Sequence, residues 1–140
     1  MAARMSVIQY RRLERQKADQ TYVLACMSDR RLTLDAWRAV VGSPPDLGGV
    51  IAAESSDRVH AVLAYSISTT AAGERQFMVE TLVAFDLLRP EDLVEPLVSA
   101  ACDLARQDCT SIGLSARLDA AGREVVLRQI AGAAVLHRVI

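Results

Sequence analysis

The residues with the clearest chemical meaning lie between 79 and 97, where an apolar run is followed by a turn and then by helical spacing. This order predicts a strand that leads into a helix N-terminus, whose free backbone N–H groups can bind a phosphate. Such a turn normally contains glycine. Here it contains three carboxylates, Glu91, Asp92 and Glu95. The segment therefore has the order of a cofactor-binding element, with side chains that disfavour an anionic cofactor.

The composition predicts one globular domain over residues 1–140. The chain is 51% hydrophobic and 24% charged, which is enough apolar material for a core, and its formal net charge is −1. We interpret the one concentration of basic residues as a solvated face: Arg4, Arg11, Arg12, Arg15 and Lys17. We therefore expect no nucleic-acid partner.

The cysteines and the apolar runs predict a soluble, cytoplasmic protein with no membrane partner. Cys26, Cys102 and Cys109 are odd in number, lack C-x-x-C spacing and lie in or beside apolar helical patterns, which favours buried, reduced thiols. Residues 1–9 lack the apolar region of a signal peptide. No apolar run reaches the roughly 20 residues that a bilayer requires.

The periodicity of apolar residues predicts a mixed sheet with helices on both faces. Strands are expected at 5–10, 49–54, 58–69, 76–87, 111–116 and 133–140. Helices are expected at 14–28, from the cap Thr33 to Gly42, from the acidic turn to 107, and after the cap Asp119. The order β-α-α-β-β-β-α-β-α-β indicates the α/β (α+β) class.

This order, with a long fourth strand that leads directly into the third helix, resembles the GNAT N-acetyltransferase superfamily over nearly the whole chain. In that family the fourth strand ends in a Q/R-x-x-G-x-G/A turn whose backbone amides hold the pyrophosphate of acetyl-CoA. The corresponding residues here are Arg89-Pro90-Glu91-Asp92-Leu93-Val94. The resemblance thus gives cofactor-binding positions to Arg89, Asp92, Leu93 and Val94.

The substitutions in this turn predict that acetyl-CoA is not bound in the usual mode. Val94 adds bulk and Asp92 adds negative charge where the family has small residues, and Pro90 and Pro96 remove two N–H donors. We expect Asp92 and Glu95 to use the remaining amides of 89–97, as in a self-capping helix start. An open pyrophosphate cradle is then not expected. No cofactor is predicted, unless the chain is an enzyme that binds acetyl-CoA or another CoA species.

The resemblance leaves one catalytic candidate, Glu80. Family members often use a fourth-strand glutamate to deprotonate an amine, and a carboxylate in a partly buried cleft can act as a general base. We expect Glu80 at or near a cleft between the fourth and fifth strands, on one strand face with Met78, Leu82 and Ala84. The alternative is a glutamate at a cleft mouth or paired with an arginine. Many members also have a tyrosine general acid near the end of the fourth helix; Arg128 stands there, and arginine does not release a proton near neutral pH.

The two histidines receive no catalytic role. His60 is expected on the opposite face of its strand from Tyr65, which is typical of a surface histidine. His137 has no Asp, Glu or Cys cluster near it in the sequence, so no metal site is expected. The sequence contains no G-x-S-x-G elbow, Walker loop, Rossmann fingerprint or zinc spacing.

Three functions remain open. The first is a GNAT-like domain with an eroded acetyl-CoA site that works as a non-catalytic ligand-sensing or protein-interaction module. The second is a divergent acyl-CoA-dependent N-acyltransferase with Glu80 as its base and with Arg89 and helix amides holding the CoA. The third is a structural dimerisation domain.

A homodimer is also expected. GNAT domains usually finish with two strands after the fourth helix, whereas this sequence offers one, at 133–140. An apolar strand beside an unfilled sheet position can be covered by a second subunit across a two-fold axis. The alternative is that it packs beside the fifth strand of its own chain.

Overall fold

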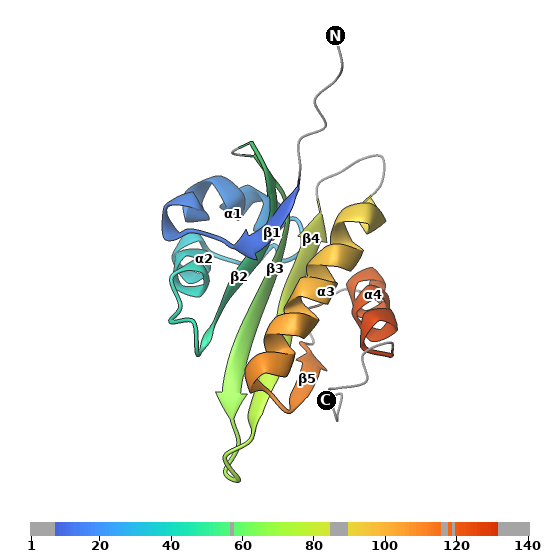
Figure 1. Cartoon of the computed structure of the whole chain (residues 1–140). Helices are drawn as coiled ribbons and strands as arrows, with labels where there is room; N and C mark the ends of the chain where they lie inside the picture. The colour runs from blue at the N-terminus through green and yellow to red at the C-terminus, as the bar shows by residue number, and fades with distance from the viewer. Residues whose placement is uncertain (1–7, 57, 85–89, 116–117, 119, 132–140) are drawn as a thin grey trace.

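The computed structural model describes residues 8–56, 58–84, 90–115, 118 and 120–131. Its elements are β1 (Gln9–Arg12), the 3₁₀ turn η1 (Arg15–Lys17), α1 (Ala18–Cys26), α2 (Leu34–Val41), β2 (Gly48–Ser55), β3 (Arg58–Thr69), β4 (Arg75–Ala84), α3 (Pro90–Asp108), β5 (Ser111–Leu114) and α4 (Ala120–Ala131) (Figure 1). This confirms the predicted order as far as α4. The strand predicted at 133–140 and the cap Asp119 lie outside the described residues.

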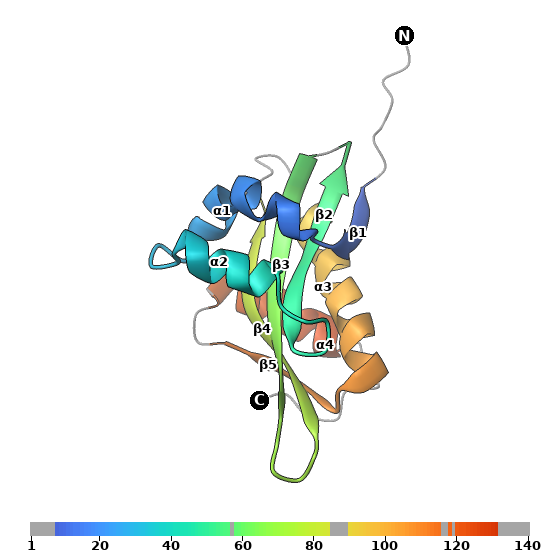
Figure 2. The same ribbon diagram turned by 90° about the vertical axis from the view of Figure 1, so that its left-hand side faces the viewer.

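The five strands form one sheet in chain order, β1-β2-β3-β4-β5. Neighbouring strands are antiparallel except β4 and β5, which are parallel because α3 forms the crossover between them. Figures 1 and 2 show α1 and α2 on one face of the sheet and α3 and α4 on the other. The predicted mixed sheet with helices on both faces is therefore confirmed.

The two central strands β2 and β3 are buried on both faces, because each face has its own apolar core. One core packs against α3 and contains Ile51, Ala53, Ala61, Leu63 and Phe77 among its members. The other packs against α1 and α2, and its sheet residues alternate with the first set: Val50, Ala52, Val62 and Ala64. Such strands read as nearly continuous hydrophobic runs, as this sequence does.

Helix α2 begins and ends as its sequence predicts. Thr33 is the N-cap, and its Oγ1 accepts a hydrogen bond of 3.1 Å from the Ala36 N–H. Gly42 is the C-cap. Trp37 on this helix is 1% exposed, and its Nε1–H donates to Thr21 Oγ1 of α1 over 3.0 Å. This buried bond holds α2 against α1, and α2 forms part of one wall of the site described below.

A β-bulge interrupts the pairing of β3 with β4. Tyr65 pairs with Val79 and Ala64 pairs with Thr81, so Glu80 is an extra residue on β4. The bulge corrects the predicted face of Glu80. Beyond it the alternation is reversed, so that Leu82 lies in the core on the α3 side instead of sharing a face with Glu80.

A second register shift, between Ala53 and Glu54, changes the predicted face of one β3 residue. Glu54 pairs with Val59 and Ala53 with Ala61, so His60 is the extra residue there. Val59 consequently packs against the core under α1 and α2, whereas Ala61, Leu63 and Tyr65 lie in the core under α3. The alternation of apolar residues in 58–69 predicts one common face for Val59, Ala61, Leu63, Tyr65 and Ile67. The structure confirms this face from Ala61 onward, and Val59 lies on the other face.

Candidate active site

The candidate site lies where β5 separates from β4. The ladder between these strands ends at Val79 and Leu114, followed by a single bond of 2.9 Å from the Ser115 N–H to the Val79 carbonyl. Strand β4 continues to Ala84, and in the described part of the chain only β3 pairs with it there. From Glu80 onward, β4 therefore has an edge facing β5 to which no described strand is bound.

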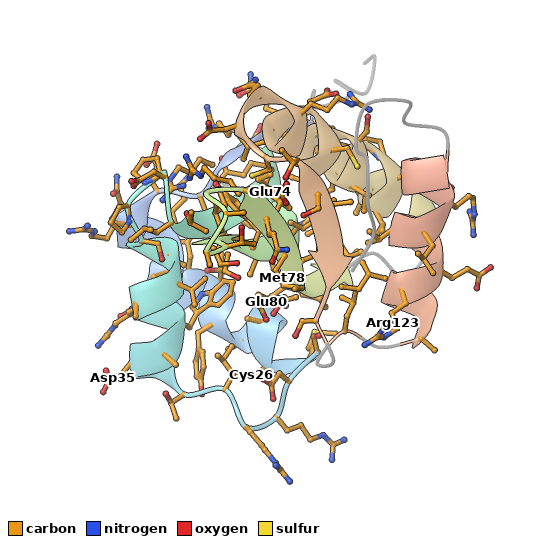
Figure 3. The ribbon with its side chains drawn as sticks, turned by 90° about the horizontal axis from the view of Figure 1, so that it is seen from below. Cys26, Asp35, Glu74, Met78, Glu80 and Arg123 are labelled. Atoms are coloured by element: carbon orange, nitrogen blue, oxygen red, sulfur yellow. The ribbon has the colours of Figure 1, made fainter. Side chains whose placement is uncertain are left out.

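Glu80 is the first β4 residue beyond this ladder. Its side chain is half-buried, and its Oε1 accepts a hydrogen bond of 2.9 Å from Ser66 Oγ on β3. Figure 3 shows Glu80 in the interior, with α1 and α2 on its side of the sheet, whereas Arg123 lies on α4 beyond β5. Neighbouring residues of a regular strand point to opposite faces, but at the bulge both Glu80 and Thr81 line the same cavity. The Glu80 side chain therefore faces a hollow and not a packed core.

A cavity of about 370 Å³ is lined in part by Glu80. One wall comes from the α1–α2 connection and α2, another from the segment before β2, and the floor from β3 and β4. Its described lining residues are Asp29, Leu32, Trp37, Val40, Ser43, Leu47, Ala64, Tyr65, Ser66, Glu80 and Thr81. The two ionisable carboxylates of this lining are Glu80 and Asp29, and none of the described lining residues is a lysine or an arginine.

The start of α3 holds the positions that the sequence assigns to phosphate binding. Pro90 is the first helical residue, where its missing N–H costs no helical hydrogen bond. Leu93 is 3% exposed and Val94 is half-buried against the same core, so both side chains face the protein. Arg89 and the side chain of Asp92 lie outside the described part of the chain.

In the described contacts Glu95 pairs with α4 and not with the amides at the start of α3, which differs from the sequence-based expectation for this residue. Its Oε1 lies 3.0 Å from Nη1 of Arg128 on α4, in an ion pair at the surface. Glu95 is the sixth residue of the helix, beyond the first turn that contains the free N–H groups, so its carboxylate is available to α4. Arg128 also lies 3.4 Å from Glu124 Oε1. The residue at the tyrosine position is thus engaged in holding α4 to α3.

The described histidine and the three cysteines do not line this cavity. His60 and Ser55 share a hydrogen bond at the β2–β3 hairpin. All three cysteines are free; Cys102 is buried and the other two are half-buried. Burial raises the pKa of the Cys102 and Cys109 thiols, which keeps them protonated and poorly nucleophilic at neutral pH. Among the described residues, no three His, Cys, Asp or Glu side chains come together as a metal site.

Asp29 and Ser66 are site residues that sequence reasoning missed. Asp29 lies in the α1–α2 connection, where its Oδ1 accepts a bond of 3.0 Å from the Arg31 N–H. This local turn is visible in the sequence only as a polar residue between two helices, and its approach to Glu80 depends on tertiary packing. Ser66 could have been found as the polar member of β3 two residues beyond Ala64, on the face that carries α1 and α2.

None of the helices described is long and apolar enough to cross a membrane. No family model matches the sequence, and no curated protein matches it. Solved structures do match.

An aminoglycoside N-acetyltransferase solved in complex with CoA has a TM-score of 0.70 and 14% identity, over 100% of this chain and 96% of that one. A ribosomal-protein-alanine N-acetyltransferase from Brucella melitensis has a TM-score of 0.72 and 12% identity, over 87% of this chain and 89% of that one. A glucosamine-6-phosphate N-acetyltransferase from Arabidopsis thaliana has a TM-score of 0.66 and 13% identity, over 91% and 92%. At such identities the likeness shows a shared fold.

Proposed function

We propose that this chain, which has the fold of the GNAT N-acetyltransferases, transfers an acyl group from a CoA thioester to an amine. The observation that carries the proposal is the position of Glu80. Its side chain lines a cavity, on the bulge, at the point where β5 leaves β4. A base, a hollow for the acceptor and an open strand edge for the donor are thus adjacent.

The open edge of β4 suits the extended arm of a CoA thioester. From Glu80 to Ala84 the backbone faces a side where no described strand pairs with it, and amide groups of an extended ligand can bond such an edge. The start of α3 suits the phosphates less well. Pro90 has no N–H, so the backbone donors left in the first turn are those of Glu91, Asp92 and Leu93. We therefore place more of the donor's binding on β4 than on the phosphate turn.

The chemistry assigned to Glu80 is removal of a proton from the acceptor ammonium. The free amine nitrogen then bonds to the acyl carbon and the carbon–sulfur bond breaks. The sulfur leaves with the electron pair and takes up the second proton, which the nitrogen loses as the amide forms, to give the thiol. The thioester supplies the electrophilic carbon and a good leaving group. Ser66 donates to one oxygen of the carboxylate, which leaves the other oxygen to face the acceptor.

A non-catalytic ligand-sensing module is the second candidate. It is favoured by the residues at the phosphate turn, where Pro90 removes a donor and Asp92 and Val94 stand at positions that are small in acetyltransferases. In that case the cavity would bind a ligand without turnover.

The test is a thiol-release assay with acetyl-CoA and a panel of small amines, together with thermal unfolding in the presence of acetyl-CoA and of CoA. We expect release of free thiol that depends on an amine, and we expect a ligand at 100 times its Kd to add about 2.7 kcal/mol of stability. Glu80→Gln, which keeps an acceptor for Ser66, should lower kcat by about 100-fold or more and leave the CoA-induced shift unchanged.

Glu124→Gln is the matched control, because it removes a surface carboxylate whose side chain is 75% exposed. Equal turnover in Glu80→Gln and the wild type would remove the proposed base. A thermal shift with CoA but no turnover with any amine would favour the sensing module.

A further inference from the structure

We infer that the acceptor of this site is a small aliphatic diamine, bound with one ammonium at Glu80 and the other at Asp29. The inference rests on the proposed acyl transfer and names its acceptor class. It starts from the charge of the cavity, since each described lining side chain that is ionised at neutral pH carries a negative charge.

The two carboxylates of the cavity come from separate elements, and no described lysine or arginine of the lining balances their charge. Glu80 is on β4 and Asp29 is in the α1–α2 connection. Arg30 and Arg31 follow Asp29 in the sequence, but both are exposed and neither lines the cavity. In a partly enclosed space such charges act more strongly on a ligand than on a solvated surface.

Asp29 is held in place for such a role. Its Oδ1 accepts the Arg31 N–H, its own N–H donates to the Ala25 carbonyl over 3.3 Å, and its carbonyl accepts the Leu32 N–H over 3.2 Å. These three bonds fix the turn at both sides of the residue. Its Oδ2 has no hydrogen bond among those described, so it can accept one from a ligand.

Size and apolar lining complete the description of the acceptor. A volume of about 370 Å³ is near the lower end for small-molecule sites, and about a dozen waters would fill it. The lining also includes three apolar side chains from the α1–α2 connection and α2: Leu32, Trp37 and Val40. A short methylene chain with an ammonium at each end matches a lining that combines two carboxylates with apolar side chains.

The experiment compares 1,4-diaminobutane with butylamine and with 4-aminobutanoate, which share the chain length and differ at the far end. We expect kcat/KM for the diamine to exceed that for butylamine by about tenfold, equal to about 1.4 kcal/mol, and 4-aminobutanoate to be the poorest acceptor. Diamines of other lengths then locate the best spacing. Binding of each amine without acyl donor is measured by calorimetry.

The variant Asp29→Asn keeps an oxygen for the Arg31 N–H and removes the charge. It should raise KM for the diamine about tenfold more than it raises KM for butylamine. Asp35→Asn is the control, because Asp35 lies on the exposed side of α2, outside the cavity (Figure 3).

The outcomes separate this inference from the proposed function. Transfer to butylamine that equals transfer to the diamine, or an Asp29→Asn effect of the same size on both, would overturn the diamine while acyl transfer stands. Diamine binding that depends on Asp29 without any turnover would keep the binding site and remove the transferase. Absence of both turnover and binding would overturn both.

Discussion

Glu54 is a buried carboxylate whose ionised form is stabilised by two cationic side chains. It is 3% exposed, and its carboxylate accepts hydrogen bonds from Arg11 Nε at 2.7 Å and from Lys17 Nζ at 3.1 Å. Burial is the largest influence on its pKa and acts to raise it. The hydrogen bonds and charges of Arg11 and Lys17 together outweigh burial, so the pKa of Glu54 lies below its ordinary value of 4.5. These contacts connect β1 and η1 to β2.

The lowered pKa of Glu54 predicts a loss of stability in acid. Since the folded state holds the ionised form better than the unfolded state does, its contribution is complete above about pH 4.5 and is lost as the pH falls through the folded-state pKa. Glu54→Gln should cost up to about 3 kcal/mol at pH 7 and should flatten the pH dependence below 4.5. Urea unfolding from pH 7 to 2 measures both effects, with Glu124→Gln as the exposed control. An unchanged acid slope in Glu54→Gln would contradict the assignment.

At the same scale, sequence reasoning identified Glu80 but not its surroundings. Glu80 stands out as a carboxylate inside an apolar strand, which single-residue chemistry can detect. Asp29 and Glu54 resemble ordinary surface acids in the sequence, because their partners are distant along the chain: Lys17 is 37 residues from Glu54. The predicted common face is wrong for Leu82 and Ala84, which lie on the α3 side, since an alternating pattern does not reveal where an extra residue is inserted.

Helix α3 contains a proline in its interior. Pro96 has no N–H to bond the carbonyl four residues earlier, and it lies on the exposed side of the helix, where water can reach that carbonyl. The helix nevertheless forms over 19 residues because its other face is buried against the sheet through residues that recur at helical spacing: Leu93, Leu97, Ala101 and Ala105. Packing therefore outweighs the local penalty.

Replacing this proline should stabilise the protein. Pro96→Ala restores a backbone hydrogen bond, and the gain is offset in part because alanine leaves the unfolded chain more flexible. We expect a net increase of about 1 to 2 kcal/mol in the free energy of unfolding, measured by denaturant titration. Ser99→Ala, one turn further on and also exposed, should change it by less than about 0.5 kcal/mol. Destabilisation by Pro96→Ala would contradict the net penalty assigned to this proline.

Element order was predictable because local signals agree with it. The Thr33 cap, the Gly42 stop and the hairpin between β2 and β3 all lie where the sequence predicts them. Ends that depend on pairing were less predictable. Strand β1 was expected at 5–10, but its paired residues extend to Arg12, opposite Ile51, because β2 determines where it stops. The predicted helix at 14–28 is divided into η1 and α1.

On the scale of the whole molecule, the sheet has an uncovered end in its described part. Strand β5 is the last strand of the described sheet, and β4 is the one described strand that pairs with it. Its outer edge can accept a further strand. The apolar sequence of 133–140 could supply that strand within its own chain or to a second copy.

We propose a two-fold homodimer in which residues 133–140 pair across the axis or exchange between subunits. Light scattering at micromolar concentration should give twice the 15.2 kDa mass of the chain. Deletion of 136–140 should then cause aggregation or unfolding. A monomer mass for the full chain would exclude the dimer and favour pairing within one subunit.

The candidate base Glu80 is the extra residue of the β4 bulge, so it pairs with no residue of β3. Val79 and Thr81 pair with successive residues of β3, so the sheet needs nothing between them. Loss of the Glu80 codon would join two segments that are already in register, and both apolar cores would keep their faces. For the proposed transferase, one in-frame deletion would thus remove the base and leave the register of the sheet unchanged, and one insertion would restore it.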